Sequence, residues 1–456
     1  MKKIHHEVLL RSIKLLNVVL AAVCFAVCCL RSYLTPGRTW SEEVPQLLLL
    51  ALFVTMYCVF GRIYEAFQIS TKRISEMIYS QGLALLMSNG VLFVVLWIML
   101  SRFPRILPML LCYVVQLLIA TLWCIGGNRL YYRIFKPKAT AIIYGTRQGM
   151  EQLIHRYGLG RKYDVRLTRT VEECLEDRSM LDGMEVVFLS GIHSRERNII
   201  LKYCIARNIQ VLVVPRLGDV LMSSAIPSHV FHFPMLRVDR YAATPEYLFV
   251  KRTMDILLSL IALIVLSPIM VCVAIAIHAC DKGPVFYTQI RLTKDGREFR
   301  IHKFRSMRVD AERDGVARLS TGDNDDRITP IGRIIRKTRL DELPQLLDIL
   351  RGDLSIVGPR PERPEIAAQY MEELPEFALR LQAKAGLTGY AQVYGKYNTE
   401  PYDKLMMDLM YISHPSLVED FKIIMATVKI LFMSESTEGV EEGQTTAAAE
   451  KTQVNI

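Results

Sequence analysis

Three charged segments in the second half of the chain contain residues that could hold and transfer phosphate. They read Lys-Phe-Arg-Ser-Met at 303–307, Leu-Asp-Glu-Leu-Pro-Gln at 340–345 and Gly-Pro-Arg-Pro-Glu-Arg-Pro at 358–364. Several fixed cations can hold a diphosphate, and adjacent carboxylates such as Asp341 and Glu342 can supply a nucleophile and a hard oxygen ligand for Mg²⁺. By residue type alone, these segments fit phosphoryl transfer and a solvated network of surface charges equally well.

The elements that position these segments include membrane helices. Of the 456 residues, 51% are hydrophobic and only 22% are charged, which argues against a freely soluble enzyme, a disordered chain and a secreted disulfide scaffold. Such a length predicts two or three domains. Four apolar runs are long enough to cross a bilayer core, which needs about 17–25 residues. They cover residues 15–30, 44–60, 83–100 and 106–125.

Basic residues orient these four runs. They lie before the first run, between the second and third, and after the fourth: Lys2, Lys3, Arg11, Lys14, Arg62, Lys72, Arg73, Arg129, Arg133, Lys136 and Lys138. Because cytoplasmic loops carry the excess of Lys and Arg, residues 1–135 are predicted to form four transmembrane helices with both ends cytoplasmic. The net charge of +10 then indicates contact with the inner leaflet and with phosphate, and no nucleic acid is expected.

A middle domain of α/β type is predicted at 139–245. Short apolar strands at 139–144, 185–189 and 210–214 alternate with helical stretches such as 149–157, a pattern typical of a Rossmann-like sheet. The loop after the first strand reads Gly-Thr-Arg-Gln-Gly and lacks the glycine order that lets a pyrophosphate approach a helix. The module is therefore predicted to be structural or regulatory and to bind no dinucleotide.

A fifth apolar segment, residues 256–279, has Ser267 and Pro268 at its middle. An interior proline removes a backbone hydrogen bond and favours a sharp bend. Basic residues lie on both flanks, so a single crossing would leave one cluster outside. A re-entrant helix over about 255–280, entering and leaving on the cytoplasmic face, is predicted; a proline-kinked full span is the alternative.

The region from Lys251 to about residue 433 resembles the bacterial sugar transferases, the monotopic polyprenyl-phosphate phosphoglycosyl transferases. The resemblance rests on the apolar hairpin, the three charged segments and Ala-Gly-Leu-Thr-Gly-Tyr-Ala-Gln-Val at 385–393, in that order. With four spans and a Rossmann-like module in front, the chain resembles the large, exopolysaccharide-initiating branch of the family. The resemblance implies an α+β catalytic domain at 250–433 and places the helix break at Ser267 and Pro268.

The resemblance also implies a covalent mechanism. Asp341 matches the family nucleophile, which attacks the β-phosphate of a UDP-sugar, releases UMP and carries the sugar phosphate as an aspartyl phosphate. A polyprenyl phosphate then attacks this intermediate. Glu342 matches the partner carboxylate that helps to bind the cofactor Mg²⁺. Splitting one difficult transfer between two anions into two displacements agrees with the physical basis of covalent catalysis.

Cations around the carboxylates match the family's phosphate contacts. Lys303, Arg336 and Arg360 are expected to contact substrate phosphates. Arg363 could bind substrate or pair with a neighbouring glutamate, and Arg305 could form a structural ion pair instead. The motif departs from the commonest pattern at Ala385, where proline is frequent, so the sugar contacts of this loop remain open.

The resemblance predicts a multi-pass protein of the bacterial cytoplasmic membrane whose catalytic domain faces the cytoplasm. Its expected partners are a UDP-sugar, polyprenyl (undecaprenyl) phosphate and the lipid bilayer, with a homodimer as a further possibility. Two alternatives are a non-catalytic membrane scaffold or nucleotide-sensing regulator, and a nucleotide-sugar epimerase or dehydratase. The intact carboxylate pair argues against the first, and the missing dinucleotide fingerprint against the second. Residues 434–456 are predicted to be a disordered tail.

Overall fold

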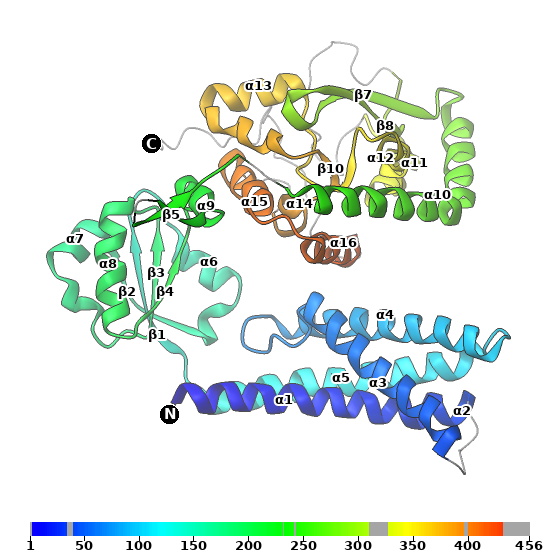
Figure 1. Cartoon of the computed structure of the whole chain (residues 1–456), viewed down its shortest axis with the longest axis horizontal. Coiled ribbons are helices and arrows are strands. Elements are labelled where there is room, and N and C mark those ends of the chain that lie inside the picture. Colours follow the sequence, from blue (N-terminus) through cyan, green and yellow to red (C-terminus); the bar gives the residue numbers. More distant parts are fainter. Residues whose placement is uncertain are drawn as a thin grey trace. The chain divides into compact units, whose positions relative to one another are not determined.

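The computed structural model describes residues 2–33, 40–230, 232–240, 243–309, 327–395 and 400–431 (Figure 1). The predicted tail at 434–456 lies outside these residues. The chain divides into two compact units, Met1–Val214 and Pro215–Ile456.

The first unit begins with apolar helices. They are α1 (Lys2–Phe25), the π-helical turn η1 (Ala26–Leu30), α2 (Arg31–Tyr33), α3 (Trp40–Ile63), α4 (Ile74–Leu100) and α5 (Ile106–Ile134). By length and composition four segments here could cross a membrane. Polar side chains connect the helices: Asn17 donates to the Tyr57 hydroxyl at 2.9 Å, and Asn89 donates to Gln116 at 2.7 Å. Such buried bonds hold apolar helices together in a defined arrangement.

A four-stranded parallel sheet with the order β2-β1-β3-β4 follows these helices. Its strands are β1 (Lys138–Tyr144), β2 (Tyr163–Thr170), β3 (Val186–Ser190) and β4 (Gln210–Val213), and its helices are α6 (Met150–Arg156), α7 (Val171–Glu176) and α8 (Ser194–Ala206). Short 3₁₀ turns are η2 (Leu159–Arg161) and η3 (Arg178–Leu181). The predicted α/β region is present, and the three apolar strands lie where the pattern placed them. The edge strand β2 was not predicted because its residues alternate in burial along a polar sequence.

The second unit begins at Pro215, inside the range 139–245 that the sequence assigned to the middle domain. Its first elements are α9 (Leu217–Ser223) and the antiparallel hairpin of β5 (Ile226–Val230) and β6 (Phe233–Arg237). Val220 of α9 packs in one core with Leu405, Leu409 and Ile412. This shared core explains why the structure divides ahead of residue 245.

The rest of the second unit is of α+β type. Its elements are α10 (Pro245–Asp281), β7 (Phe286–Leu292), η4 (Lys294–Gly296), β8 (Glu298–Phe304), α11 (Pro330–Lys337), η6 (Leu340–Glu342), α12 (Gln345–Arg351), β9 (Ser355–Val357), α13 (Pro364–Glu373), η7 (Pro375–Gln382), β10 (Gly386–Thr388), α14 (Tyr390–Tyr394), α15 (Pro401–Ser413) and α16 (Leu417–Leu431). Strands β7 and β8 pair antiparallel, and β9 and β10 pair parallel.

The apolar segment with Ser267 and Pro268 forms one continuous helix, α10, of 37 residues. Figure 1 shows that this helix changes direction part-way along. Pro268 is its interior proline, and Ser267 Oγ donates to the Ile264 carbonyl oxygen at 2.8 Å. The predicted break is thus a change of direction within one helix, and an interior proline is a usual cause of such a kink.

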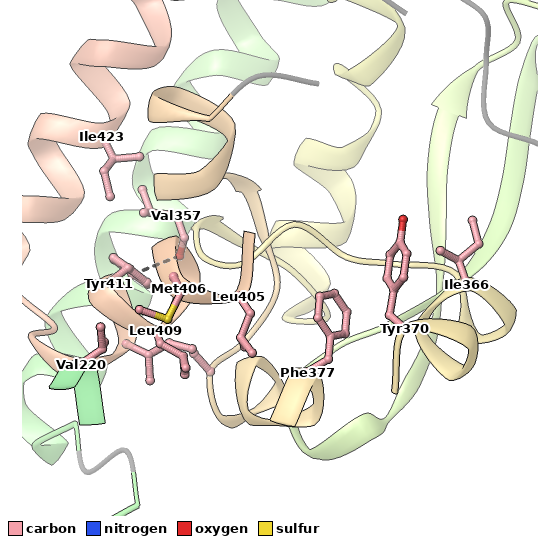
Figure 2. Close-up of a cluster of buried hydrophobic side chains, with 12 residues drawn as sticks. Val220, Val357, Ile366, Tyr370, Phe377, Leu405, Met406, Leu409, Tyr411 and Ile423 are labelled. Atoms are coloured by element: carbon pink, nitrogen blue, oxygen red, sulfur yellow. Dashed lines mark hydrogen bonds between the residues drawn. The ribbon is translucent and has the colours of Figure 1, made fainter. Parts of the chain in front are cut away.

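A hydrophobic core of the second unit contains Val357 and Ile366, which lie on either side of the segment at 358–364 in the sequence (Figure 2). Tyr370 and Phe377 pack edge to face with ring centroids 5.1 Å apart, and Leu405 and Leu409 of α15 are fully buried beside them. Val357, at the end of β9, belongs to the same cluster. Packing at this density fixes where the chain leaves β9 and enters the charged segment.

Candidate active site

The two adjacent carboxylates lie in a tight turn between α11 and α12. Thr329 caps α11 by accepting a hydrogen bond from the Gly332 amide at 2.9 Å. After the helix ends, Arg339 adopts a left-handed conformation (φ 57°), and the 3₁₀ turn η6 follows with Asp341 and Glu342. The left-handed residue stops the helix and turns the next residues into the interior. Asp341 is consequently only 8% exposed.

Glu342 lies at the centre of a group of cations. Lys303 Nζ donates to Glu342 Oε1 at 2.8 Å. Arg360 Nη2 lies 3.9 Å from the same oxygen, and Arg339 Nη1 lies 3.9 Å from Oε2. These side chains come from β8, from the segment after β9 and from the turn before η6. Two segments that are distant in sequence, carrying Lys303 and Arg360, therefore meet the turn of Arg339 at one carboxylate.

Burial and charge act differently on the two carboxylates. Burial, together with repulsion from Glu342, raises the pKa of Asp341 to about 6 despite the nearby Lys303 and Arg336. Burial also opposes the charged form of Glu342, but Lys303, Arg360 and Arg339 outweigh it and hold the pKa of Glu342 well below its usual range. The surrounding cations thus favour the charged form of Glu342, whereas burial and its neighbour give Asp341 the higher proton affinity of the two.

The described residues satisfy the Asp341 carboxylate only in part. Its Oδ1 is buried and has no hydrogen-bond partner within the described part of the chain. An unpartnered buried carboxylate oxygen costs about 1–3 kcal/mol or more, so its presence in a folded protein calls for a functional explanation. Arg336 Nη1, from the last turn of α11, is also buried without a partner among the described residues. This cation acts electrostatically on Asp341.

A small pocket that is open to solvent lies beside Glu342. Its lining combines cations, amides and apolar groups: Arg291, Ile301, Lys303, Glu342, Gln345, Arg360, Pro361, Gly386, Leu387 and Gln392. Three cations face one carboxylate in this lining, so the pocket favours an anionic ligand. Arg291, Gln345 and Gln392 were not among the predicted site residues. Gln392 lies within the segment 385–393 that carried the resemblance, which was the available signal for it.

Arg305 and Arg363, two further cations considered from the sequence, lie outside the pocket lining. Arg305 forms a two-pronged ion pair with Asp281 at the end of α10, with contacts of 2.5 and 2.8 Å, and its Nε donates to the Pro284 carbonyl oxygen at 2.7 Å. This geometry fits the structural ion pair considered for it. Arg363 is half-buried immediately before α13 and lies outside the pocket lining, close enough to Arg291 to lower its pKa.

A buried network holds the segment that carries Arg360. Arg380 Nη2 donates to the Arg360 carbonyl oxygen at 2.9 Å and lies 2.6 Å from Asp408 Oδ2, while Nη1 lies 3.5 Å from Glu362. The side chains of Arg380 and Asp408 are 4% and 1% exposed. Nothing in the local sequence pattern indicated that Arg380 would support the site, because its partners lie 18 to 28 residues away. The network positions Arg360 through its main chain.

The region that holds the site is similar in sequence to known proteins. Residues 246–434 match the family model described as bacterial sugar transferase. The chain is 41% identical over 203 residues to the exopolysaccharide production protein PSS of Rhizobium leguminosarum bv. phaseoli, covering 98% of that protein and 42% of this chain. The chain belongs to the bacterial sugar transferase family. The family match contains every element of the candidate site, from α10 to α16.

Other members of the bacterial sugar transferase family match a similar part of the chain. One is the UDP-N-acetylgalactosamine-undecaprenyl-phosphate N-acetylgalactosaminephosphotransferase of Aeromonas hydrophila, 35% identical over 234 residues, or 51% of this chain and 54% of that protein. Another is the UDP-glucose:undecaprenyl-phosphate glucose-1-phosphate transferase of Escherichia coli (strain K12), 40% identical over 183 residues, or 39% of each chain. The chain thus spans about half or less of the length of these two relatives.

Proposed function

We propose that this protein transfers a sugar 1-phosphate from a UDP-sugar to undecaprenyl phosphate and releases UMP. The observation that carries the proposal is the buried pair Asp341 and Glu342 with a surrounding group of cations, in which one Asp341 oxygen has no partner among the described residues. The two family members from Aeromonas and Escherichia are named for reactions of this type, with different sugars. The Rhizobium relative's name supports a role in exopolysaccharide production.

Asp341 provides the nucleophile in the proposed mechanism. A carboxylate oxygen of Asp341 bonds to the β-phosphorus of the UDP-sugar, and the bond from that phosphorus to the bridging oxygen breaks. The electron pair leaves with UMP, and the sugar phosphate stays on Asp341. An oxygen of undecaprenyl phosphate then bonds to the same phosphorus and expels the Asp341 carboxylate. Lys303, Arg336 and Arg360 stabilise the negative charge of the phosphates during both displacements.

The carboxylate pair also fits a magnesium ion. Among the described residues no three His, Cys, Asp or Glu side chains gather to form an all-protein metal site. Mg²⁺ is commonly held by one or two carboxylates together with substrate phosphates, and Glu342 with the free Asp341 oxygen offers such a set. Glu342 is the proposed ligand. The bound ion would neutralise charge on the reacting phosphates.

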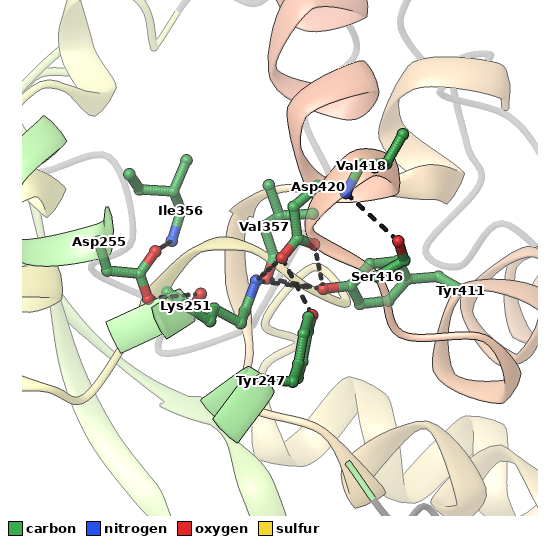
Figure 3. Close-up of polar contacts among 10 residues, drawn as sticks. Tyr247, Lys251, Asp255, Ile356, Val357, Tyr411, Ser416, Val418 and Asp420 are labelled. Carbon is green, nitrogen blue, oxygen red and sulfur yellow. Dashed lines mark hydrogen bonds and ion pairs between the residues drawn. The ribbon is translucent and has the colours of Figure 1, made fainter. Parts of the chain in front are cut away.

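Helix α10 is proposed to enter the bilayer and return on the same side. A straight helix of 37 residues would extend about 55 Å. Both ends of α10 nevertheless bind the same unit. Near the start Lys251 Nζ donates to Asp420 at 2.8 Å (Figure 3). At the end Asp281 pairs with Arg305. Only 11% of the most apolar stretch of α10 is buried within the protein, whereas 28–44% of the corresponding stretches of the other four candidate spans is buried. Lipid is the natural cover for this surface.

Further parts of the proposal concern location and assembly. We place the first 135 residues in the bacterial cytoplasmic membrane as four spans with both ends cytoplasmic, and the catalytic domain on the cytoplasmic side. The Rossmann-like module is proposed to be structural or regulatory. A homodimer is proposed for the whole protein.

Asp341→Asn is the decisive variant. The wild-type chain, in detergent with undecaprenyl phosphate and Mg²⁺, should release UMP from at least one member of a panel of UDP-sugars, and Asp341→Asn should abolish this release. Glu376→Gln, an exposed carboxylate on η7, is the matched control and should retain activity. Near-normal turnover by Asp341→Asn would contradict the mechanism. A non-catalytic scaffold would release no UMP. An epimerase would alter the sugar of the UDP-sugar, again without releasing UMP.

A further inference from the structure

Unpartnered buried atoms gather at the active-site pocket. Within the described part of the second unit, five buried side-chain nitrogen or oxygen atoms have no hydrogen-bond partner: Arg291 Nε, Arg336 Nη1, Asp341 Oδ1, Gln392 Oε1 and Ser259 Oγ. The first four belong to the carboxylate pair's surroundings or to the pocket lining. Because each such atom costs folding free energy, their concentration in one place indicates groups that a ligand satisfies.

Gln392 supplies an acceptor in a pocket that is otherwise rich in donors. Its Nε2 donates to the Leu387 carbonyl oxygen at 3.3 Å. This contact settles the orientation of the amide, since the reverse orientation would bring two acceptor oxygens together. Oε1 therefore needs a ligand group with an O–H or N–H. Phosphate oxygens bound by cations only accept hydrogen bonds, so they cannot satisfy Gln392.

Arg291 supplies a donor that the protein fixes in place. Its Nη1 donates to the Pro361 carbonyl oxygen at 3.1 Å and its Nη2 to Gln289 Oε1 at 2.7 Å, which leaves Nε as the nitrogen without a partner in the described chain. Burial lowers the pKa of Arg291 to about 10, so the guanidinium remains charged at neutral pH. A charged, oriented N–H in a positive pocket suits a phosphate oxygen.

We infer that the pocket between Arg291 and Gln392 binds the boundary between the diphosphate and a hydroxyl- or N–H-bearing group of the nucleotide sugar. Arg291 Nε donates to a phosphate oxygen, and Gln392 Oε1 accepts from the neighbouring group. That group is either the sugar or the nucleoside, since both carry such donors. Leu387 and Ile301 supply apolar surface to the same pocket. This inference rests on the proposed function. It adds Gln392 as a residue that contacts the non-phosphate part of the substrate.

Gln392→Met tests the inference because methionine keeps the length of the side chain and removes the acceptor. Without ligand, the full-length variant in detergent should unfold within about 2 °C of wild type, because loss of the Nε2 hydrogen bond to the Leu387 carbonyl oxygen offsets removal of the unsatisfied Oε1. With UDP-glucose or UDP-N-acetylgalactosamine, the affinity and the KM for UMP release should worsen about tenfold, the effect of one lost buried hydrogen bond. Glu376→Gln is again the exposed control.

Binding of UMP and UDP distinguishes the two sources of the donor. If Gln392→Met weakens only the UDP-sugar, the sugar is the group that Gln392 contacts; if it weakens all three equally, the nucleoside is. Either result supports an acceptor role. Unchanged affinity for all three, or a lower unfolding temperature with an unchanged KM, would overturn the inference and leave Gln392 a structural residue. If the wild type binds no UDP-sugar at all, the proposed function fails instead.

Discussion

The buried Arg380 network gives the most demanding test of how the fold supports the site. Arg380→Met removes the cation that contacts Asp408 at 2.6 Å and Glu362 at 3.5 Å, and the donor to the Arg360 carbonyl oxygen. Removing one member of a buried ion pair typically costs about 3–5 kcal/mol, because the partner charge stays buried without compensation. For a domain of about 150–250 residues this corresponds to a fall of roughly 6–20 °C in unfolding temperature. The KM for the UDP-sugar should also rise, since Arg360 loses a support.

A second substitution separates lost attraction from stranded charge. Arg380→Met leaves the carboxylates of Asp408 and Glu362 without this cation. In the double variant Arg380→Met/Asp408→Asn the Asp408 charge is also removed, so about 1–3 kcal/mol of the lost stability should return. Thermal unfolding of the full-length chain in detergent, followed by fluorescence, measures both variants against the exposed control Glu376→Gln. The reasoning is refuted if Arg380→Met unfolds within about 2 °C of that control, or if the double variant is less stable than the single one.

Three further predictions concern structure and topology. Arg305→Lys keeps the charge but loses the two-pronged geometry, so the unfolding temperature should fall by the equivalent of about 1–3 kcal/mol while the KM stays unchanged; a raised KM with unchanged stability would instead indicate substrate contact. Gly332→Ala places a Cβ 1.9 Å from the Ser306 carbonyl oxygen and should cost about 2–4 kcal/mol in thermal unfolding, whereas Gly218→Ala, with open space around it, should be neutral or stabilising. A cysteine at the exposed Lys294 should react with a membrane-impermeant maleimide only from the cytoplasmic side; labelling from the periplasm would mean that α10 crosses the bilayer completely.

Local patterns in the sequence predicted the elements that depend on local physics. The apolar strands β1, β3 and β4 were found because their hydrophobic runs are buried in a parallel sheet, and the long apolar helices because bilayer thickness sets their length. Strand β2 and the grouping of α9 with the second unit were missed. Both depend on packing against distant residues, which a local pattern does not contain.

The candidate site also combines features that the sequence predicts with features that only the tertiary structure sets. Asp341 and Glu342 could be singled out because they are adjacent, and adjacency alone makes two carboxylates interact. Their separate proton affinities depend on which cations surround each one, and Lys303 and Arg360 reach Glu342 only through the tertiary fold. The sequence alone thus determined what kinds of group are present: a carboxylate pair, several cations and an apolar helix interrupted by proline. Only the tertiary structure decided which oxygens are left free and which are paired, because burial and hydrogen bonding are properties of surroundings assembled from the whole unit.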